Sequence, residues 1–502
     1  MLILFVGLYF TVLLLLCSYG LHRANLVYLV WRHRDRVRAA CQLEAGSAQS
    51  LPTVTIQLPI FNEATVVARL LGGVDSIDYP RDRLEVQVLD DSTDETRHIA
   101  QRTVEELRDR GLDIKYVRRS DRNGYKAGAL DYGLKTASGE LIAIFDADFI
   151  PQPGFLTSIV GHFNDAAVGM VQTRWGHLNR DAGILTRVQA LMLDGHHLVE
   201  NQARFGAGCF FNFSGTGGVW RRRAIDSAGG WQHDTLTEDL DLSYRAQLKG
   251  WKFVYRPDVI TPAELPEDMA AMRAQQFRWA KGTVQTARKL LPGILSSRLS
   301  WRMRLEAAFH MLPHFAYPLM LLLSVLLLPA LILMPATDLS TMLAIDLPLC
   351  LGATGSLVTF YAMAERAQGR SAWHAVRAMP GLIALGAGLS PFLTRAVVEG
   401  LRTMSGEFVR TPKRGRDASR YYQVTKWPFA ELCLGVLSST SVVVAVQTNH
   451  WFALPFAALF AAGYFYVAGR LIAEQAQARR QVFAPVADGP LEVESSGMAR
   501  VV

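Results

Sequence analysis

Long stretches of uncharged, apolar residues constrain this chain more than any other feature of its sequence. The first stretch, Met1–Leu21, contains no charged residue. A run of about 20 apolar residues is long enough for a helix that spans a lipid bilayer. Further runs occupy Phe315–Pro335, Leu347–Ala364, Ala378–Thr394, Leu432–Thr448 and Trp451–Gly469. We therefore predict a multi-pass protein in contact with a lipid bilayer.

The basic residues that flank these runs predict their orientation. Arg32 and Arg34 belong to a basic stretch that follows the first run, and such residues gather on the cytosolic side of membrane helices. A cleaved signal peptide is the alternative for this run, but no basic residue precedes it. We predict an anchor over residues 1–31, in the plasma (inner) membrane, with the next segment of the chain in the cytosol.

The run Ala378–Thr394 breaks the pattern, because Arg377 precedes it and Arg395 follows it. Both of its flanks therefore have the charge of cytosolic segments. The run is also short and contains Gly388 and Pro391, and irregular backbone at membrane depth is tolerated where protein covers it. We expect a re-entrant or interfacial segment here rather than a crossing.

Composition and cysteine usage exclude several classes of protein. With 502 residues, 50% of them hydrophobic, and a mean hydropathy of +0.14, the chain is too apolar for an ordinary soluble protein. Its net charge of +7 suits anionic lipids and substrate phosphates, and no nucleic-acid recognition motif occurs, so we expect no nucleic-acid partner. The five cysteines form no C-x-x-C pair, which argues against structural zinc and a disulfide framework.

From Leu51 onward, short β-rich runs alternate with helical stretches. This alternation predicts a parallel α/β sheet with right-handed crossovers. Ligands of such sheets bind beyond the carboxyl ends of the strands. The expected strands are Thr53–Leu58, Leu84–Leu89, Ile114–Val117 and Leu141–Phe145, and the expected helices are Glu63–Gly72, Glu95–Arg110 and Tyr125–Thr136.

Acidic residues follow two of these strands. Asp90 and Asp91 end the second strand, whereas Asp146 and Asp148 follow the fourth. No G-x-G-x-x-G or G-x-x-x-x-G-K-[ST] motif accompanies them. Carboxylates bind a nucleotide diphosphate only through a bridging cation, so Asp146 and Asp148 predict a Mg²⁺ or Mn²⁺ site. A solvated acidic turn is the alternative for this pair, and a helix N-cap is the alternative for Asp90–Thr93.

Two helix starts carry charged side chains suited to the same site. Lys126 opens a helix whose dipole also attracts a diphosphate, although a surface lysine is the alternative. Glu238 and Asp239 open another helix after Thr237, where acids also serve as helix-stabilising residues. Asp239 is the best remaining candidate for a general base that deprotonates an acceptor hydroxyl.

Gln275, Arg278 and Trp279 are spaced i, i+3 and i+4, so one face of a helix presents all three. An indole can stack on a sugar ring, and a guanidinium group can bind phosphate oxygens. A helix lying on the membrane surface is a compatible alternative. His196 and His197 are adjacent, which is poor spacing for joint metal ligation, so we expect no metal between them.

Eight motifs lie between Leu51 and Leu290 in a characteristic order: QVLDDSTDET, GYKAGAL, IFDADF, VQTRWGHLN, FNFSGTGGVWR, TEDLDL, LKGWKFVY and QQFRWAKG. On these motifs the chain resembles the cellulose synthase-like branch of the family 2 glycosyltransferases, and within it the plant mannan and xyloglucan-backbone synthases. The resemblance implies a GT-A fold, which is a doubly wound, Rossmann-like α/β domain, inserted between transmembrane helices.

The resemblance also implies roles for the candidate residues. Asp91 and Lys126 would bind the nucleotide-sugar donor, as would Arg278, and Asp146 would bind both the donor diphosphate and the metal. Asp148 would be the second metal ligand and Asp239 the catalytic base. Glu238, Gln275 and Trp279 would contact the acceptor or the donor sugar.

A downstream segment, EFVRTPKRG, resembles the gating loop F-x-V-T-x-K of cellulose synthases. Phe408, Thr411 and Lys413 match this pattern, whereas Arg410 replaces the valine. Lys413 is therefore expected at the donor. The predicted organisation is an anchor (1–31), a catalytic domain (51–290), interfacial helices (291–314), a transmembrane region (315–473) with the gating-like loop (402–426), and a partly disordered cytosolic tail (474–502).

The function expected from this resemblance is that of a membrane-bound inverting hexosyltransferase. It would transfer a hexose from UDP-glucose or GDP-mannose to a growing β-linked polysaccharide, processively and with coupled export. One alternative is single addition to a lipid acceptor, as in ceramide glucosyltransferases. Another is a chitin or hyaluronan synthase-like enzyme that uses UDP-N-acetylhexosamine. The sequence does not choose between these donors, nor between glycan and glycolipid acceptors.

Overall fold

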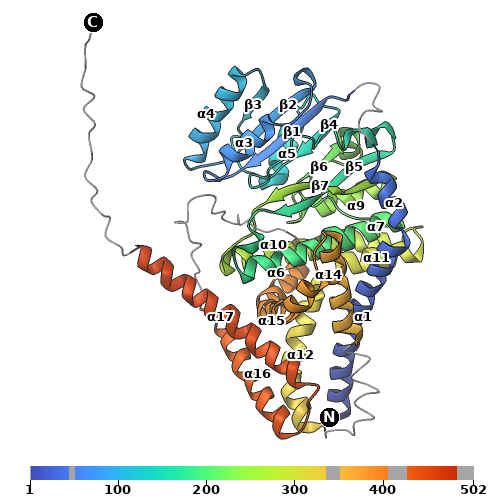
Figure 1. Ribbon diagram of the computed structural model, residues 1–502, viewed down its shortest axis with the longest axis vertical. Helices are drawn as coiled ribbons and strands as arrows, with labels where there is room; N and C mark the ends of the chain where they lie inside the picture. The colour runs from blue at the N-terminus through green and yellow to red at the C-terminus, as the bar shows by residue number, and fades with distance from the viewer. Residues whose placement is uncertain (1, 44–50, 335–350, 405–426, 483–502) are drawn as a thin grey trace.

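An α/β domain sits at one end of a stem of long helices in the computed structural model of the protein (Figure 1). The structure describes residues 2–43, 51–334, 351–404 and 427–482. The α/β domain lies between helix α1, which precedes it in sequence, and the remaining stem helices, which follow it. This arrangement agrees with the expected insertion of the domain between apolar helices.

A mixed sheet of seven strands, in the order β3-β2-β1-β4-β6-β5-β7, forms the centre of the domain. The strands are β1 Val54–Ile60, β2 Leu84–Asp90, β3 Asp113–Val117, β4 Leu141–Ile144, β5 Val168–His177, β6 Gly218–Arg221 and β7 Lys252–Ala263. β1 to β4 confirm the predicted parallel strands. β6, which the sequence analysis did not predict, pairs antiparallel with both β4 and β5, so the complete sheet is mixed.

Helices cover both faces of this sheet. Buried side chains of α3 and α4 pack on one face, and those of α5, α8 and α9 pack on the other. The central strands β1 and β2 are buried almost throughout, as expected for strands covered on both sides. The helices are α2 Arg34–Cys41, α3 Val67–Asp75, α4 Thr96–Asp109, α5 Tyr125–Leu134, α6 Ile184–Gly195, α7 Asn201–Ala207, α8 Arg222–Ser227 and α9 Glu238–Leu248.

Two helices, α10 and α11, lie between the α/β domain and the stem (Figure 1). The predicted domain boundary at residue 290 falls inside α10, which is a single helix. The remaining helices of this part are α1 Leu2–Arg32, α10 Met269–Leu295, α11 Trp301–Met311, α12 Ala316–Leu333, α14 Ser356–Ala367, α15 Ala372–Arg402, α16 Phe429–Gln447 and α17 Leu454–Val482.

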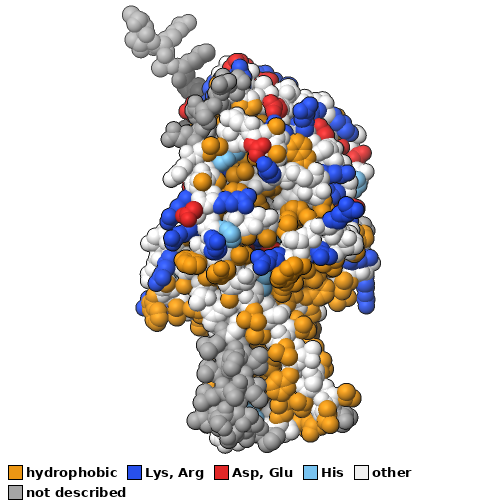
Figure 2. Space-filling view, turned by 90° about the vertical axis from the view of Figure 1, so that its right-hand side faces the viewer, with side chains coloured by type: hydrophobic (Ala, Val, Ile, Leu, Met, Phe, Trp, Pro, Cys, Tyr) orange, Lys and Arg blue, Asp and Glu red, His pale blue; other side chains and the backbone are white. Residues whose placement is uncertain are grey.

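Five helices among the described residues are long and apolar enough to cross a membrane, namely α1, α12, α15, α16 and α17. In Figure 2, hydrophobic side chains cover the described part of the stem on this face, and Lys and Arg side chains gather above them. Such a basic band matches the headgroup level of a bilayer. The run at Leu347–Ala364 is helical from residue 351 onward, as a π-helical turn followed by α14.

The expectation of a re-entrant break at Ala378–Thr394 is wrong, because α15 is one continuous helix of 31 residues. Its glycines allow close helix crossing instead. A Cβ atom at Gly388 would lie 2.3 Å from the carbonyl oxygen of Gly463 in α17, and small residues serve such crossings in membrane helices. The second half of α15 runs along α10, where Phe392 contacts Phe277 with ring centroids 5.0 Å apart. An interfacial position of α15 stays a prediction.

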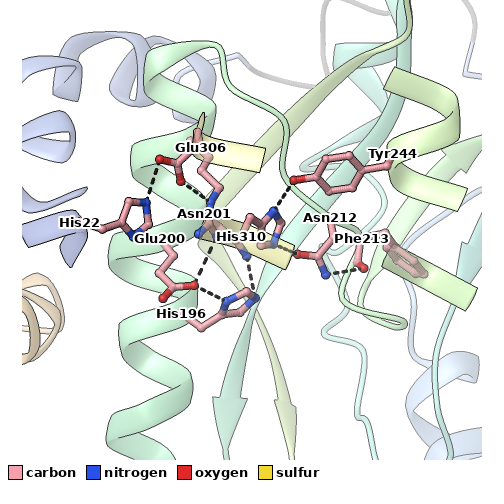
Figure 3. A network of polar contacts seen from close by, with 10 residues as sticks. His22, His196, Glu200, Asn201, Asn212, Phe213, Tyr244, Glu306 and His310 are labelled. Atoms are coloured by element: carbon pink, nitrogen blue, oxygen red, sulfur yellow. Dashed lines mark hydrogen bonds and ion pairs between the residues drawn. The ribbon is translucent and has the colours of Figure 1, made fainter. Parts of the chain in front are cut away.

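A buried polar network joins the anchor helix α1 to the base of the α/β domain (Figure 3). Glu306 of α11 bonds His22 of α1 through one carboxylate oxygen, at 2.9 Å, and Arg204 of α7 through the other, also at 2.9 Å. Arg204 is 2% exposed and also pairs with Glu200 at 3.3 Å. The negative charge of Glu306 thus compensates a guanidinium group that water does not reach.

Glu306→Gln should destabilise the protein by about 3–5 kcal/mol, because it leaves the buried Arg204 with one carboxylate partner instead of two. For a domain of this size the unfolding temperature should fall by roughly 6–20 °C, measured by tryptophan fluorescence in detergent micelles. Arg302→Gln, an exposed charge removal on the same helix, is the control. Equal unfolding temperatures for the two variants would contradict the structural importance of the network.

Candidate active site

The predicted metal-binding pair lies just beyond the carboxyl end of β4. Asp148 is 9% exposed, and Asp146 is half-buried. The backbone N–H of Asp146 donates to the Thr216 hydroxyl, 2.9 Å away, which fixes this turn against the segment before β6. The two carboxylates therefore stand at the strand end where ligands of such sheets bind.

Lys126, near the start of α5, lies beside this pair. Its ammonium group forms an ion pair with Asp146 and donates to the carbonyl oxygen of Gly215 at 2.9 Å. Gly215 has a φ of +82°, and a Cβ atom there would lie 3.1 Å from the Asp239 carboxylate and 3.5 Å from the Lys126 nitrogen. The glycine thus allows Lys126 and Asp239 to approach the same turn, and the alternative of a surface lysine is wrong.

Glu238 and Asp239 begin α9, as predicted, and complete a set of four carboxylates with Asp146 and Asp148, which we call the acidic cluster. Burial is the main cause that raises the pKa of Asp239 to about 7, and the charge of Glu238 adds to the effect. Burial also raises the pKa of Glu238, although Lys126 opposes this shift. Asp239 is therefore poised to exchange a proton near neutral pH.

The alternative role of a capping group does not account for Asp239. The side chain of Thr237 forms no capping hydrogen bond at the start of α9 and instead bonds the Thr286 hydroxyl at 3.1 Å. The Asp239 carboxylate accepts the N–H of the next residue, Leu240, at 2.8 Å, and the side chain remains half-buried. By contrast Asp241 is fully buried and paired with Arg245, which is a structural role.

Arg278 of α10 faces the acidic cluster. Burial lowers the pKa of its guanidinium group, and the negative charges of all four carboxylates oppose that shift. Gln275 and Trp279 lie on the same half-exposed side of α10, as the i, i+3, i+4 spacing predicts. The structure therefore brings Arg278 to the acidic cluster, whereas the roles of Gln275 and Trp279 stay predictions.

Asp91 lies at the end of β2 with both carboxylate oxygens bound by Arg119, a residue that the sequence reasoning missed. The two side chains are 7% and 9% exposed. Arg119 also donates to the carbonyl oxygens of Asn123 and Tyr125, in the loop that leads into α5. Asp91 is thus not the N-cap of α4, which starts at Thr96. The pair ties the end of β2 to the Lys126 helix.

Trp175 of β5 is a second residue near the site that sequence reasoning did not single out. Its indole N–H donates to the carbonyl oxygen of Thr216, and its ring contacts Phe149 at 5.1 Å and His197 at 5.1 Å. The motif VQTRWGHLN was its only signal. His197 itself is buried, and its Nδ1 lies 3.2 Å from the Tyr255 hydroxyl.

The residues present fit a divalent cation that is shared with substrate. In the described part of the chain, no group of three or more His, Cys, Asp and Glu side chains is placed to hold a metal on its own. Mg²⁺ and similar hard cations are commonly held by one or two carboxylates, with water and substrate phosphates completing the coordination. Asp146 and Asp148 supply such a pair. Lys413 lies outside the described residues.

A comparison with known proteins relates the part of the chain that contains this site to a protein family. Residues 52–282 match the model of the family described as "Glycosyltransferase like family 2". This part of the chain is similar to a family 2 glycosyltransferase domain. The matched residues contain β1 to β7 and every residue of the acidic cluster, so the site just described belongs to that domain.

Relatives with similar sequences are named as plant mannosyltransferases. The chain is 42% identical over 273 residues to a probable glucomannan 4-β-mannosyltransferase 7 of Oryza sativa subsp. japonica, covering 53% of this chain and 46% of that protein. It is 40% identical over 282 residues to glucomannan 4-β-mannosyltransferase 2 of Arabidopsis thaliana, covering 54% and 53%. The chain thus matches about half the length of these relatives.

A solved structure with a similar fold is the mannosyltransferase PcManGT from Pyrobaculum calidifontis, determined in complex with GDP-Man and Mn²⁺. The TM-score is 0.52 at 24% sequence identity, over 74% of this chain and 99% of the other. This likeness confirms the GT-A fold that the motifs implied.

Proposed function

We propose that the protein is a membrane-bound inverting hexosyltransferase that transfers mannose from GDP-mannose to a growing β-linked glycan. The observation that carries this proposal is the meeting of Lys126, Asp146 and Asp239 around Gly215, inside a family 2 glycosyltransferase domain. The names of the plant relatives and of the structural neighbour favour mannose over glucose as the sugar.

Asp239 is the proposed general base. Its ionised carboxylate accepts the proton of the acceptor hydroxyl while that oxygen attacks the anomeric carbon of the donor sugar. The bond from this carbon to the diphosphate breaks on the opposite side, so the configuration inverts and the nucleoside diphosphate leaves with the electron pair. The half-buried position of Asp239 gives an acceptor access to the carboxylate.

Lys126 and Arg278 are the proposed cationic contacts of the diphosphate. Both face the acidic cluster, whose four carboxylates outnumber these two cations and would repel an unaccompanied diphosphate. Mg²⁺ or Mn²⁺ held by Asp146 and Asp148 would offset this repulsion and the charge that develops on the leaving group. Asp91 then acts through Arg119 to hold the end of β2 at the nucleotide.

In this proposal α10 contacts the acceptor, and the stem helices anchor the protein in the membrane. Gln275 and Trp279 offer an amide and an indole ring to a sugar acceptor, and Glu238 lies beside the base. The five apolar helices anchor the domain to a bilayer. We place the domain on the cytosolic side of the plasma (inner) membrane, because Arg32 ends α1 and Arg34 begins α2 on the side of the domain.

Radiolabelled donors test the proposed function. Membrane vesicles that contain the protein should incorporate label from GDP-mannose with Mn²⁺ present, and an endo-β-1,4-mannanase should release that label from the product. UDP-glucose and UDP-N-acetylglucosamine should give much less incorporation. Label that enters only a chloroform-soluble product would favour single addition to a lipid, and incorporation from UDP-glucose alone would refute the mannose assignment.

The raised pKa of Asp239 predicts the pH dependence of the reaction. A base accepts a proton only when it is ionised, so kcat/KM should rise about tenfold per pH unit below pH 7 and level off above it. Glu238 lies next to Asp239, and each carboxyl group affects the ionisation of the other. The pKa measured from the rate profile therefore belongs to the pair. Initial rates between pH 5 and 9, at fixed ionic strength and Mn²⁺, check this. A flat profile would contradict the assignment.

A further inference from the structure

A pocket of about 280 Å³ lies beyond the carboxyl end of β5, next to the connection between α14 and α15. Its lining includes Arg174, His177 and Arg180 from β5 and the turn that follows, and Gln368 and Arg370 from the α14–α15 connection. No member of the acidic cluster lines it. The pocket is thus separate from the site of sugar transfer, and it is strongly basic.

The charges of this pocket are only partly compensated. Arg180 pairs with the buried carboxylates of Asp194 and Glu365, which are both 1% exposed, and His177 bonds Asp194 at 3.1 Å. These contacts use the carboxylates of Asp194 and Glu365, and Asp258, a third acid that acts on Arg174, pairs with Arg256 at 2.7 Å. The negative charges close to the lining are therefore already paired.

The guanidinium groups of Arg174 and Arg370 have no carboxylate partner among the described residues. Arg174 donates through Nε to the carbonyl oxygen of Pro257, 3.0 Å away, and within the described ranges of the chain neither Arg174 nor Arg370 forms an ion pair. Burial lowers the pKa of Arg174. Tyr255, Asp194 and Asp258 oppose this shift, whereas the positive charge of Arg370 adds to it. Two cations that repel each other across a pocket favour an anion between them.

The position of the connection indicates where the anion comes from. Ser371 caps α15, and the next turn carries Trp373, which is 55% exposed, with Arg377 5.9 Å from its ring. Exposed tryptophan beside arginine is typical of the membrane–water interface. Arg370 directly precedes this turn, so the pocket opens at the level of lipid headgroups.

We propose that this pocket binds a phosphate group, and that the phosphate belongs to the headgroup of an anionic phospholipid such as phosphatidylglycerol. Guanidinium groups bind phosphate oxygens in a forked geometry. The volume is at the lower end of the range for small-molecule sites, which suits a headgroup and leaves the acyl chains in the bilayer. The inference is independent of the proposed donor and acceptor.

The test measures binding to the full-length protein in detergent micelles, by the fluorescence of short-chain lipid analogues. Dihexanoyl phosphatidylglycerol should bind, and Arg370→Gln should raise its Kd at least about tenfold, because a charge-assisted contact is lost. Arg366→Gln, at an exposed position in the last turn of α14 and outside the lining, should leave the Kd unchanged. Arg174→Gln combined with Arg370→Gln should abolish binding.

Inorganic phosphate is the second arm of the experiment. If phosphate competes with the lipid only at much higher concentration, the headgroup is the ligand. If inorganic phosphate binds as tightly as the lipid and Arg370→Gln weakens both, a soluble phosphate compound is the ligand and the lipid assignment fails. Lipid binding that Arg370→Gln and the double variant leave unchanged would overturn the site itself. A matched unfolding temperature for each variant shows that the fold is intact.

Discussion

Asp239→Asn should lower the rate of sugar transfer by about 10²–10⁴-fold while leaving nucleotide and Mn²⁺ binding nearly unchanged. The amide keeps the size of the carboxylate and can still accept the N–H of Leu240, but it cannot accept the proton of an acceptor hydroxyl. The loss should therefore appear in kcat and not in the donor Kd. Calorimetric titration with GDP beside a radiolabel transfer assay separates the two quantities.

The matched control for this variant is Asp234→Asn. Asp234 is an acid just before the same helix, 48% exposed and paired with Lys289 at 2.8 Å, and it contacts no member of the acidic cluster. Its removal should change transfer less than about twofold, the scale of an exposed ion pair. Near wild-type turnover in Asp239→Asn would contradict the assignment of Asp239 as the general base. An equal loss of transfer in Asp239→Asn and Asp234→Asn would contradict it as well.

The fold was predictable where the sequence pattern alone sets the structure. β1 to β4 are short β-rich runs separated by helical stretches, a pattern that predicts the parallel strands of an α/β sheet, and β1 and β2 are buried almost throughout. β5, β6 and β7 were not among the predicted strands, and β6, Gly218–Arg221, is only four residues long and follows a glycine-rich turn. Its antiparallel direction depends on pairing with β4 and β5, which no local pattern encodes.

The misreading of α15 has a different physical cause. Gly388 and Pro391 weaken a helix by intrinsic propensity, which predicted a break. In the structure, close packing against α17 at Gly463 and contacts along α10 stabilise the helix through this region. Glycine there permits the crossing of two helices, and tertiary contacts of this kind override local propensity.

The part of the site that lies at strand ends and helix starts was predictable, because these positions meet at the carboxyl edge of the sheet in such folds. Asp146, Lys126 and Asp239 meet as expected, because the carboxyl edge of the sheet gathers them. Arg119 was missed because its partner Asp91 lies 28 residues away, on another strand. Gly215 was missed because a glycine contributes only by permitting close approach, which becomes visible once Asp239 and Lys126 are placed around it.

Asp148→Ala should fail in a different way from Asp239→Asn, because Asp148 is proposed to act on the donor through a metal. In the wild type, Mn²⁺ should strengthen GDP binding by offsetting repulsion between the diphosphate and the acidic cluster. In the variant, the Mn²⁺-dependent gain should disappear. Transfer should fall by at least about 10²-fold, the scale of a lost electrostatic contact to the leaving group.

The Asp148→Ala experiment titrates GDP calorimetrically with and without Mn²⁺, for wild type, Asp148→Ala and the control Asp165→Ala. Asp165 is 51% exposed, pairs with Lys252 at 3.2 Å and lies outside the acidic cluster, so its variant should keep the full Mn²⁺ effect. Asp148 is buried next to Asp146, and alanine leaves that carboxylate alone with Lys126 as its cation. An ion pair of this kind neutralises Asp146 but holds no metal ion, so GDP binding in Asp148→Ala with Mn²⁺ should equal GDP binding without it. Mn²⁺-dependent binding that survives in this variant would show that the cation is held elsewhere, and would leave Asp148 a structural residue of the β4 turn.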